Sequence, residues 1–151
     1  MQLATIEFAR NVLGLKDAHT VECDSKSKNL IININPTQAE NIKKERYGGT
    51  MRLGAYDCAL IPGSLAQKLY GVDKISERHR HRYEFDNKYK EEMEKNGLMV
   101  SGVNPQSNLV EIVELKKHPF FVGVQFHPEF KSRFLQPHPL FVGLVKAALK
   151  K

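Results

Sequence analysis

The chain has 151 residues, of which 41% are hydrophobic and 26% are charged, and its formal net charge is +6. This composition is typical of one globular domain and excludes a disordered chain. We identify no apolar run long enough to cross a bilayer and no secretory signal, so we expect no membrane insertion. The positive charge permits an anionic partner without requiring one.

The two cysteines, Cys23 and Cys58, lie far apart and match no disulfide or zinc-binding spacing. We therefore expect two reduced thiols in a cytoplasmic protein, and no metal site in this stretch of chain. Neither thiol is favoured as a nucleophile. Cys23 lies in a polar loop, and no Gly-x-Cys-x-Gly turn surrounds Cys58, which we interpret as a buried thiol.

Residues 1–13 have the spacing of an amphipathic helix, which Gly14 is suited to end. The apolar stripe of this helix is formed by Leu3, Ile6, Ala9 and Leu13. No residue that could cap the helix precedes it, because the sequence starts at Met1. We therefore expect that further chain belongs upstream.

A mixture of strands and short helices is expected after the polar loop at 16–28. The predicted strands are 29–34, 51–60, 98–103 and 109–115, and the last two are joined as a hairpin. The predicted helices are 37–44, 65–70, which Ser64 caps and Gly71 ends, and 87–96, with Tyr89 and Met93 facing inward. Residues 47–50 form a turn, and Gly54 marks a bulge or a close backbone approach.

The run at 120–126 is short, almost wholly apolar and rich in aromatic and β-branched residues. It predicts a strand buried on both faces, of the kind found inside a parallel or mixed sheet. An amphipathic helix follows at 139–150, with a proline near its start and lysines at its end. Strands and helices mixed in a single unit without repeats predict an α/β fold.

His127 and Glu129 follow the apolar run directly, on either side of Pro128. Side chains alternate along an extended segment, so both would point the same way at the end of the strand. A histidine with a neighbouring carboxylate can act as a base with its orienting group. The plainer interpretation is a structural histidine beside a solvated glutamate, and we favour the functional one. The pair lacks a nucleophile nearby.

Residues 78–82 have the sequence RHRHR, which allows three interpretations. The cations could bind phosphates, they could protect an edge strand from pairing, or one arginine could hold a small carboxylate. Only one aromatic residue, Tyr83, accompanies the run, and no RNA-binding signature does. Taken alone, the sequence does not separate the three. Glu22, taken alone, is a loop residue.

Five segments together resemble the C-terminal glutamine amidotransferase domain of the CTP synthase family: MQLATIEFARNV, GGTMRLG, SERHRHRYEF, SGVNP and VGVQFHPEF. They occur in the family's order and span essentially the whole chain. VQFHPE is shared by all class I amidotransferases, whereas GGTMRLG with ERHRHRYEF is much more specific. The resemblance implies a partial flavodoxin-like class I amidotransferase sheet with flanking helices, from which the N-terminal strands are missing.

The family makes CTP from UTP, ATP and ammonia, and its amidotransferase domain releases that ammonia from glutamine with a Cys-His-Glu triad. The cysteine belongs to a GxCLGMQ turn, of which Met1 and Gln2 match the last two residues. The resemblance therefore implies that residues 1–151 are the C-terminal part of the glutaminase domain. The triad cysteine and the synthase domain would lie outside this chain. We expect the chain alone to be inactive and to self-associate.

Matching the motifs residue by residue assigns the catalytic roles. His127 would be the triad histidine, which activates the thiol and protonates the leaving ammonia, and Glu129 would fix its tautomer. Thr50 and Arg52 match a mobile lid linked to activation by GTP.

Gln2, Glu22 and Arg82 match residues that grip the substrate glutamine, and the backbone of Tyr83 matches a neighbour that lines the same pocket. The chemistry agrees, because the α-ammonium group of glutamine needs a carboxylate and its α-carboxylate needs a cation.

The resemblance also bears on cofactors and partners. It implies no cofactor in this fragment, while the parent enzyme uses ATP and Mg²⁺ with GTP as activator and forms homotetramers. Nucleic acid becomes an unlikely partner for residues 78–82. The alternative is a non-catalytic amidotransferase-like module that binds an anionic ligand or nucleic acid through this run.

Overall fold

The computed structural model describes residues 1–34 and 51–150. The α-helices are α1 (Gln2–Asn11), α3 (Leu65–Tyr70), α4 (Lys90–Lys95) and α5 (Pro139–Leu149), and the 3-10 turns are η2 (Asn87–Tyr89) and η3 (Pro128–Phe130). The strands are β1 (His19–Thr20), β2 (Leu30–Ile34), β3 (Arg52–Leu60), β4 (Lys74–His81), β5 (Tyr83–Phe85), β6 (Leu98–Val103), β7 (Val110–Leu115) and β8 (Val122–Val124). Within the described ranges, no helix is both long and apolar enough to cross a bilayer.

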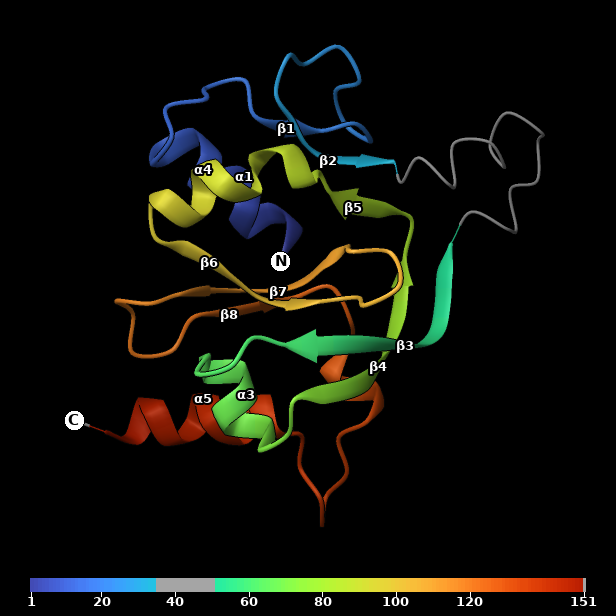
Figure 1. Cartoon of the computed structure of the whole chain (residues 1–151), viewed down its shortest axis with the longest axis vertical. Helices are drawn as coiled ribbons and strands as arrows, with labels where there is room; N and C mark the ends of the chain where they lie inside the picture. Colours follow the sequence, from blue (N-terminus) through green and yellow to red (C-terminus); the bar gives the residue numbers. More distant parts are fainter. Residues whose placement is uncertain (35–50, 151) are drawn as a thin grey trace.

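The strands form two sheets. The larger has the order β4-β3-β6-β7-β8 and antiparallel pairing throughout, and the smaller has the order β1-β2-β5 with one parallel pair, β1 with β2. Figure 1 shows α1 and α4 on one side of the larger sheet and α3 and α5 on the other. The predicted α/β mixture and the β6–β7 hairpin are therefore confirmed.

Two apolar cores lie on the two faces of the larger sheet. Successive residues of β7 supply both, because Val113 packs with the core under α1 and α4, while Ile112 packs with the core under α3 and α5. Both side chains are completely buried. The strand with two buried faces is thus β7, rather than the run at 120–126.

The prediction for 120–126 was wrong in length and in position. Only Val122–Val124 forms a strand, it lies at the end of the sheet order, and its residues are half-buried. Its apolar flanks have other roles, since Phe126 packs into the core against α3 and α5 after the strand has ended. An apolar run reports burial, and burial here comes partly from residues outside the sheet.

Most predicted helix ends are confirmed. Ser64 Oγ accepts a hydrogen bond of 3.0 Å from the amide of Gln67, and Gly71 ends α3 with a positive φ of 71°. Helix α1 has no side-chain cap, as the sequence predicts. The predicted apolar stripe of α1 was wrong at Leu3, however, because this side chain is 77% exposed. At 100° per residue, Leu3 lies about 120° around the axis from the buried Ala9.

Gly54 produces no bulge in the β3–β4 pairing, where it lies opposite His79 in regular register. A Cβ atom there would meet nothing within 4 Å, so no close approach requires glycine. Glycine is needed at position 54 because its φ is 97°, a conformation that only glycine adopts without strain. The predicted helix at 37–44, the turn at 47–50 and Thr50 lie outside the described residues.

Candidate active site

His127 and Glu129 lie in direct contact at the end of β8. The His127 Nδ1 atom is 2.7 Å from Glu129 Oε1, and both side chains remain partly open to solvent. Slight burial raises the pKa of Glu129, but its backbone amide and the hydrogen bond from His127 outweigh it and leave that pKa lowered. A carboxylate so placed holds the proton of His127 on Nδ1 and leaves Nε2 as the free base.

The route to this contact differs from the extended alternation that we predicted. Pro128–Phe130 forms a 3-10 turn, η3, which folds the carboxylate of Glu129 back onto the imidazole. The amide of His127 donates to the carbonyl of Arg78 on β4 at 2.9 Å, and its ring stacks on Phe130 with centroids 4.9 Å apart. These contacts fix both the backbone and the ring of His127.

Gln2 and Tyr83, two of the predicted glutamine ligands, lie side by side. Gln2 Nε2 donates to the carbonyl of Tyr83 at 2.9 Å and to Gln125 Oε1 at 3.2 Å. The first residue of α1 is thereby joined to β5 and to the segment that follows β8. Gln125 was not predicted as a site residue, although it belongs to the VQFHPE motif.

Glu22 and Arg82 are exposed, and no hydrogen bond within the described ranges joins either side chain to another predicted ligand. The sheet register nevertheless places the strand ends next to them, that of β1 before Glu22 and that of β5 after Arg82, at one end of the smaller sheet. Thr20 pairs with Ile32 on β2, and Ile34 pairs with Tyr83 on β5. The two outer strands are about 10 Å apart across β2, a gap that two long side chains can bridge with a ligand between them.

Arg52, matched to a lid by the resemblance, is a buried cation in the structure. Its guanidinium is 2.7 Å from Glu111 Oε1 and 3.3 Å from Glu84 Oε1, and it lies over the ring of Tyr56 at 4.4 Å. Glu84 in turn accepts a hydrogen bond of 3.2 Å from Gln125 Nε2. A buried ionic cluster therefore lies directly behind the pair formed by Gln2 and Tyr83.

The carboxylates of this cluster hold protons more tightly than exposed ones do. Burial, opposed by Arg52 and reinforced by Glu111, raises the pKa of Glu84 to about 7. Burial also raises the pKa of Glu111, although Arg52 opposes it. One guanidinium between two such carboxylates leaves the cluster with an excess of negative charge when both are ionised.

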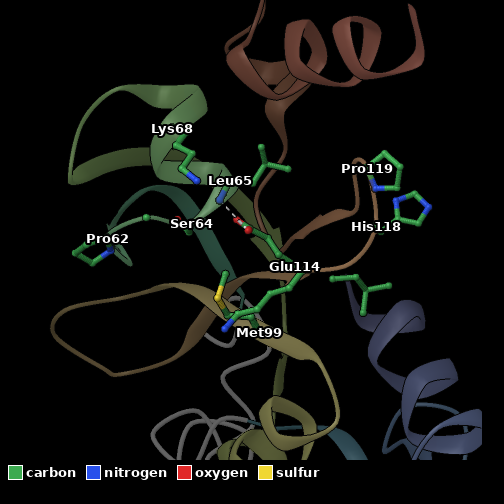
Figure 2. A pocket seen from close by; sticks show the side chains of 11 residues that line it. Pro62, Ser64, Leu65, Lys68, Met99, Glu114, His118 and Pro119 are labelled. Carbon is green, nitrogen blue, oxygen red and sulfur yellow. Dashed lines mark hydrogen bonds between the residues drawn. The ribbon is translucent and has the colours of Figure 1, made fainter. Parts of the chain in front are cut away.

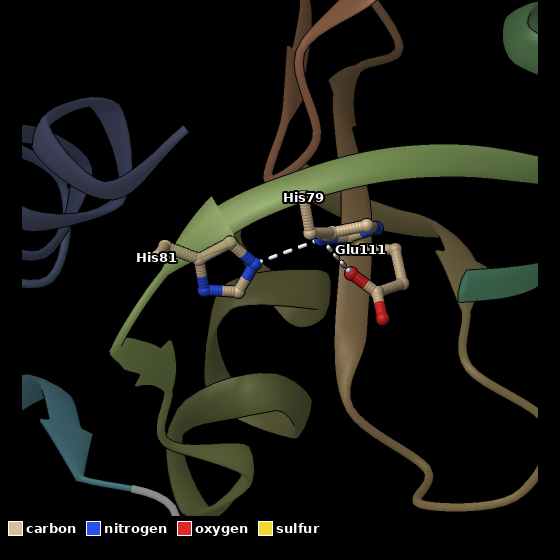
Figure 3. A group of neighbouring side chains, drawn as sticks. All are labelled: His79, His81 and Glu111. Carbon is tan, nitrogen blue, oxygen red and sulfur yellow. Dashed lines mark hydrogen bonds and ion pairs between the residues drawn. The ribbon is translucent and has the colours of Figure 1, made fainter. Parts of the chain in front are cut away.

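Two histidines of the RHRHR run join the same cluster (Figure 3). Together with Glu111, His79 and His81 offer three potential metal-ligand atoms within 4.8 Å of one another. Burial, with a smaller contribution from Arg52, lowers the pKa of His79 to about 3 and that of His81 to about 4, so both rings are neutral. However, His79 Nδ1 and His81 Nε2 share one hydrogen bond of 2.8 Å, and Arg52 already supplies Glu111 with a cation. Among the described residues, His79 Nε2 and Glu111 Oε2 are buried without a hydrogen-bond partner.

The alternation along β4 sorts the RHRHR run onto two faces. His79 is buried, whereas Arg78, Arg80 and Arg82 are exposed. Strand β4 lies at the end of the larger sheet, as the edge-strand interpretation requires. The buried partners of this run were missed, although the charged Glu111 in the apolar sequence LVEIVEL was a signal that could have been read.

A pocket of about 420 Å³ lies elsewhere, between the start of α3 and the loop after β7, and no predicted site residue lines it. Figure 2 shows the carboxylate of Glu114 pointing at the first turn of α3, where it accepts from the amides of Leu65 at 2.9 Å and Ala66 at 2.8 Å. Glu114 therefore acts as a cap for this helix. The candidate site remains the region around His127 and Gln2.

A family model described as glutamine amidotransferase class-I matches residues 1–147. The chain belongs to the class I glutamine amidotransferase family. The α/β amidotransferase fold with flanking helices is thereby confirmed, and so is the family resemblance.

Two similar proteins of this family are CTP synthases. That of Christiangramia forsetii is 57% identical over 148 residues, and that of Cytophaga hutchinsonii is 58% identical over 148 residues. Each match covers 98% of this chain but only 27% of the relative, so the chain spans about a quarter of the length of these enzymes.

A solved glutaminase domain has the same fold. The structure described as Trypanosoma brucei CTPS glutaminase domain with bound acivicin matches this amidotransferase with a TM-score of 0.90 and 38% sequence identity. The match covers 100% of this chain and 58% of that chain. The similarity to the amidotransferase domain of CTP synthase thus holds in sequence and in structure.

Proposed function

We propose that residues 1–151 form the C-terminal part of the glutaminase half of a cytoplasmic CTP synthase. In this role, glutamine is hydrolysed and its ammonia supplies the conversion of UTP to CTP, which depends on ATP and Mg²⁺ and is activated by GTP. The observation that supports it most directly is the contact of 2.7 Å between His127 Nδ1 and Glu129 Oε1.

The geometry of the pair suits the chemistry of a thiol-dependent amidase. His127 Nε2 would take the proton of a cysteine thiol, and the thiolate would attack the carboxamide carbon of glutamine. The C–N bond would then break, with the proton from the imidazolium going to the leaving ammonia. A water molecule, deprotonated by the same imidazole, would cleave the thioester and release glutamate.

The nucleophile in this proposal is supplied by a segment upstream of Met1. Within residues 1–151 there are two cysteines, and neither suits the role. Cys58 is completely buried, and burial raises the pKa of its thiol to about 12, so little thiolate exists near neutral pH. Cys23 lies in an exposed turn after β1. We therefore expect the 151-residue chain alone not to hydrolyse glutamine.

Substrate binding is assigned to the end of the smaller sheet. Glu22 would pair with the α-ammonium group of glutamine and Arg82 with its α-carboxylate, from opposite sides of the gap across β2. Gln2 and the backbone of Tyr83 would line the pocket between that end and His127.

A chimera tests the proposal. Residues 1–151 replace the matching segment of the Christiangramia forsetii CTP synthase, and ammonia release and CTP formation are measured with glutamine or with ammonium. The chimera should use both nitrogen sources. His127→Ala should lower glutamine-dependent turnover at least about a thousandfold, since triad members act as a unit, and should leave ammonium-dependent turnover intact.

The matched control is His118→Ala, which removes an exposed imidazole from the loop between β7 and β8 and should change neither activity. A chimera that uses ammonium but not glutamine would refute the proposal. Turnover by the 151-residue chain alone, lost on mutation of Cys23 or Cys58, would refute the assignment of the nucleophile.

A second candidate, a module that binds an anionic ligand or nucleic acid, is supported by the exposed arginines Arg78, Arg80 and Arg82 on and beside β4. Calorimetric titration of the chain with glutamine and with a short oligonucleotide separates the two candidates. Tight, salt-dependent binding of the oligonucleotide would favour the second candidate.

A further inference from the structure

An unbroken series of hydrogen bonds connects Arg52 to Gln2 through two residues without an assigned role. Arg52 donates to Glu84 Oε1 at 3.3 Å, and Gln125 Nε2 donates to Glu84 Oε2 at 3.2 Å. Gln2 Nε2 then donates to Gln125 Oε1 at 3.2 Å and to the carbonyl of Tyr83 at 2.9 Å. Glu84 is 2% exposed and Gln125 is 6% exposed, so water does not readily replace these partners.

The direction of the hydrogen bonds in this series, from donor to acceptor, is determined at both ends. When Glu84 is ionised, its carboxylate can only accept hydrogen bonds, so the amide nitrogen of Gln125 must face it. The oxygen of Gln125 is thereby directed at Gln2. The Tyr83 carbonyl is also only an acceptor, so the nitrogen of Gln2 must lie between these two oxygens. Both N–H bonds of Gln2 are then used, and its carboxamide oxygen is left to accept from a ligand.

We propose that Glu84 and Gln125 are positioning residues, which hold the carboxamide of Gln2 in the one orientation that binds substrate glutamine. The inference rests on the proposed function, because it takes Gln2 as a ligand for glutamine. It adds two residues and a role for Arg52, which fixes the Glu84 carboxylate from behind. Glu111 helps by binding the other guanidinium nitrogen at 2.7 Å.

Two isosteric substitutions each exchange a donor for an acceptor, or an acceptor for a donor, at one position of the series. Glu84→Gln offers one oxygen to two donors, so either Arg52 or Gln125 faces an amide nitrogen. Gln125→Glu places a second carboxylate against Glu84, and when both are ionised no hydrogen lies between the two oxygens. Each change leaves side-chain volume nearly constant, so effects of packing are small.

Combining the two substitutions restores the pattern. The new amide at position 84 accepts from Arg52 and donates to position 125, and the new carboxylate at position 125 still accepts from Gln2. The number of charges in the cluster is unchanged. In the chimera, each single variant should raise the KM for glutamine about tenfold, the loss of roughly one buried hydrogen bond, and the double variant should recover to within about threefold. CTP formation from ammonium should be the same in all.

Reciprocal rescue is the readout that a merely structural role would not produce. Unchanged KM values in both single variants would overturn the proposal, as would a double variant no better than the worse single one. The matched control is Leu53→Gln, a substitution on the exposed side of β3, which should leave the KM for glutamine unchanged.

A second measurement does not need turnover. In nitrogen-15 spectra of the 151-residue chain, the side-chain amide signals of Gln2 should shift in each single variant and return in the double variant. Unchanged Gln2 signals would overturn the positioning role by itself. A parent chimera that uses ammonium but not glutamine would instead overturn the proposed function, and with it the substrate role of the series.

Discussion

Replacing Arg52 by Met should destabilise the protein strongly, and more so at alkaline pH than at acidic pH. Arg52 is 5% exposed and carries the only guanidinium that contacts Glu84 and Glu111 among the described residues. Methionine keeps much of the apolar volume against Tyr56 but removes the charge. Two buried carboxylates would then lack their cation.

The magnitude follows from the cost of an unpaired buried charge. Removing one partner of a buried ion pair costs about 3–5 kcal/mol, and loss of the cation–π contact with Tyr56 adds about 0.5–1 kcal/mol. We therefore expect a loss of roughly 4 kcal/mol in the free energy of unfolding near pH 8. A loss of this size is a large fraction of the total stability of a typical domain.

The pH dependence has a definite sign. Arg52 lowers the pKa of both Glu84 and Glu111 in the folded state, so its removal raises both further above their unfolded values. A carboxyl with a raised pKa stabilises the fold fully below the unfolded pKa and loses that contribution as pH rises through the folded pKa. The deficit should thus shrink as the pH falls through the further raised pKa values of the variant, by up to about 1.4 kcal/mol per pH unit for each carboxyl. Glu84 should add no further change below its pKa of about 7 in the unsubstituted protein.

Urea unfolding followed by circular dichroism, at about pH 8 and about pH 5, measures the effect. The matched control is Arg80→Met, because Arg80 is exposed on the neighbouring strand opposite Leu53, and its change should stay within about 0.5 kcal/mol. A loss below about 1 kcal/mol near pH 8, or an equal loss at both pH values, would refute the electrostatic reasoning.

Three further variants test other parts of the fold. Glu114→Ala removes the acceptor for two amides at the start of α3 and should lower the unfolding free energy by about 2 kcal/mol in urea titrations; no change would mean that the cap is dispensable. Gly102→Ala places a Cβ atom 2.7 Å from Cys58 Sγ and should cost about 1–3 kcal/mol, and an unchanged midpoint would contradict the tight packing. Phe134 and Leu135 are 98% and 90% exposed, so replacing both by Ser should reduce self-association without altering stability. Light scattering measures the molar mass. If the molar mass stays above that of a monomer in the variant, the contact between copies lies elsewhere.

Local rules predicted the ends of elements well, because those rules act within a few residues. Ser64 and Gly71 bound α3 as expected, and Pro139 begins α5 after His138, whose side chain accepts from the amide of Leu140. Each of these contacts joins residues that are no more than four positions apart, so the sequence displays both partners together.

Burial on both faces could not be assigned from a short apolar run. β7 contains Glu111 and Glu114 and was read as an ordinary hairpin strand, yet it lies between two cores. The run at 120–126 has no charge and yields a strand of three residues at the end of the sheet. Which strand is central depends on the layers above and below it, and these come from distant parts of the chain.

The buried cluster of Arg52, Glu84 and Glu111 also could not be predicted from local sequence patterns. Arg52 is 32 positions from Glu84 and 59 positions from Glu111, so no spacing rule connects them. Each residue taken alone has an ordinary exposed interpretation, since charged side chains are mostly found at the surface. Only the fold shows that these three exclude water together.

The hydrogen-bond series supplies a physical reason for four separate sequence segments to occur together. Gln2 belongs to the first helix, Arg52 to GGTMRLG, Glu84 to ERHRHRYEF and Gln125 to VGVQFHPEF. The donor or acceptor required at each position is determined by the next residue in the series, so the energies of the four are coupled. A chain with only three of these four segments would bury an unpaired donor or acceptor beside Gln2 or Arg52. Four of the five segments that carry the family resemblance are therefore joined by one series of hydrogen bonds.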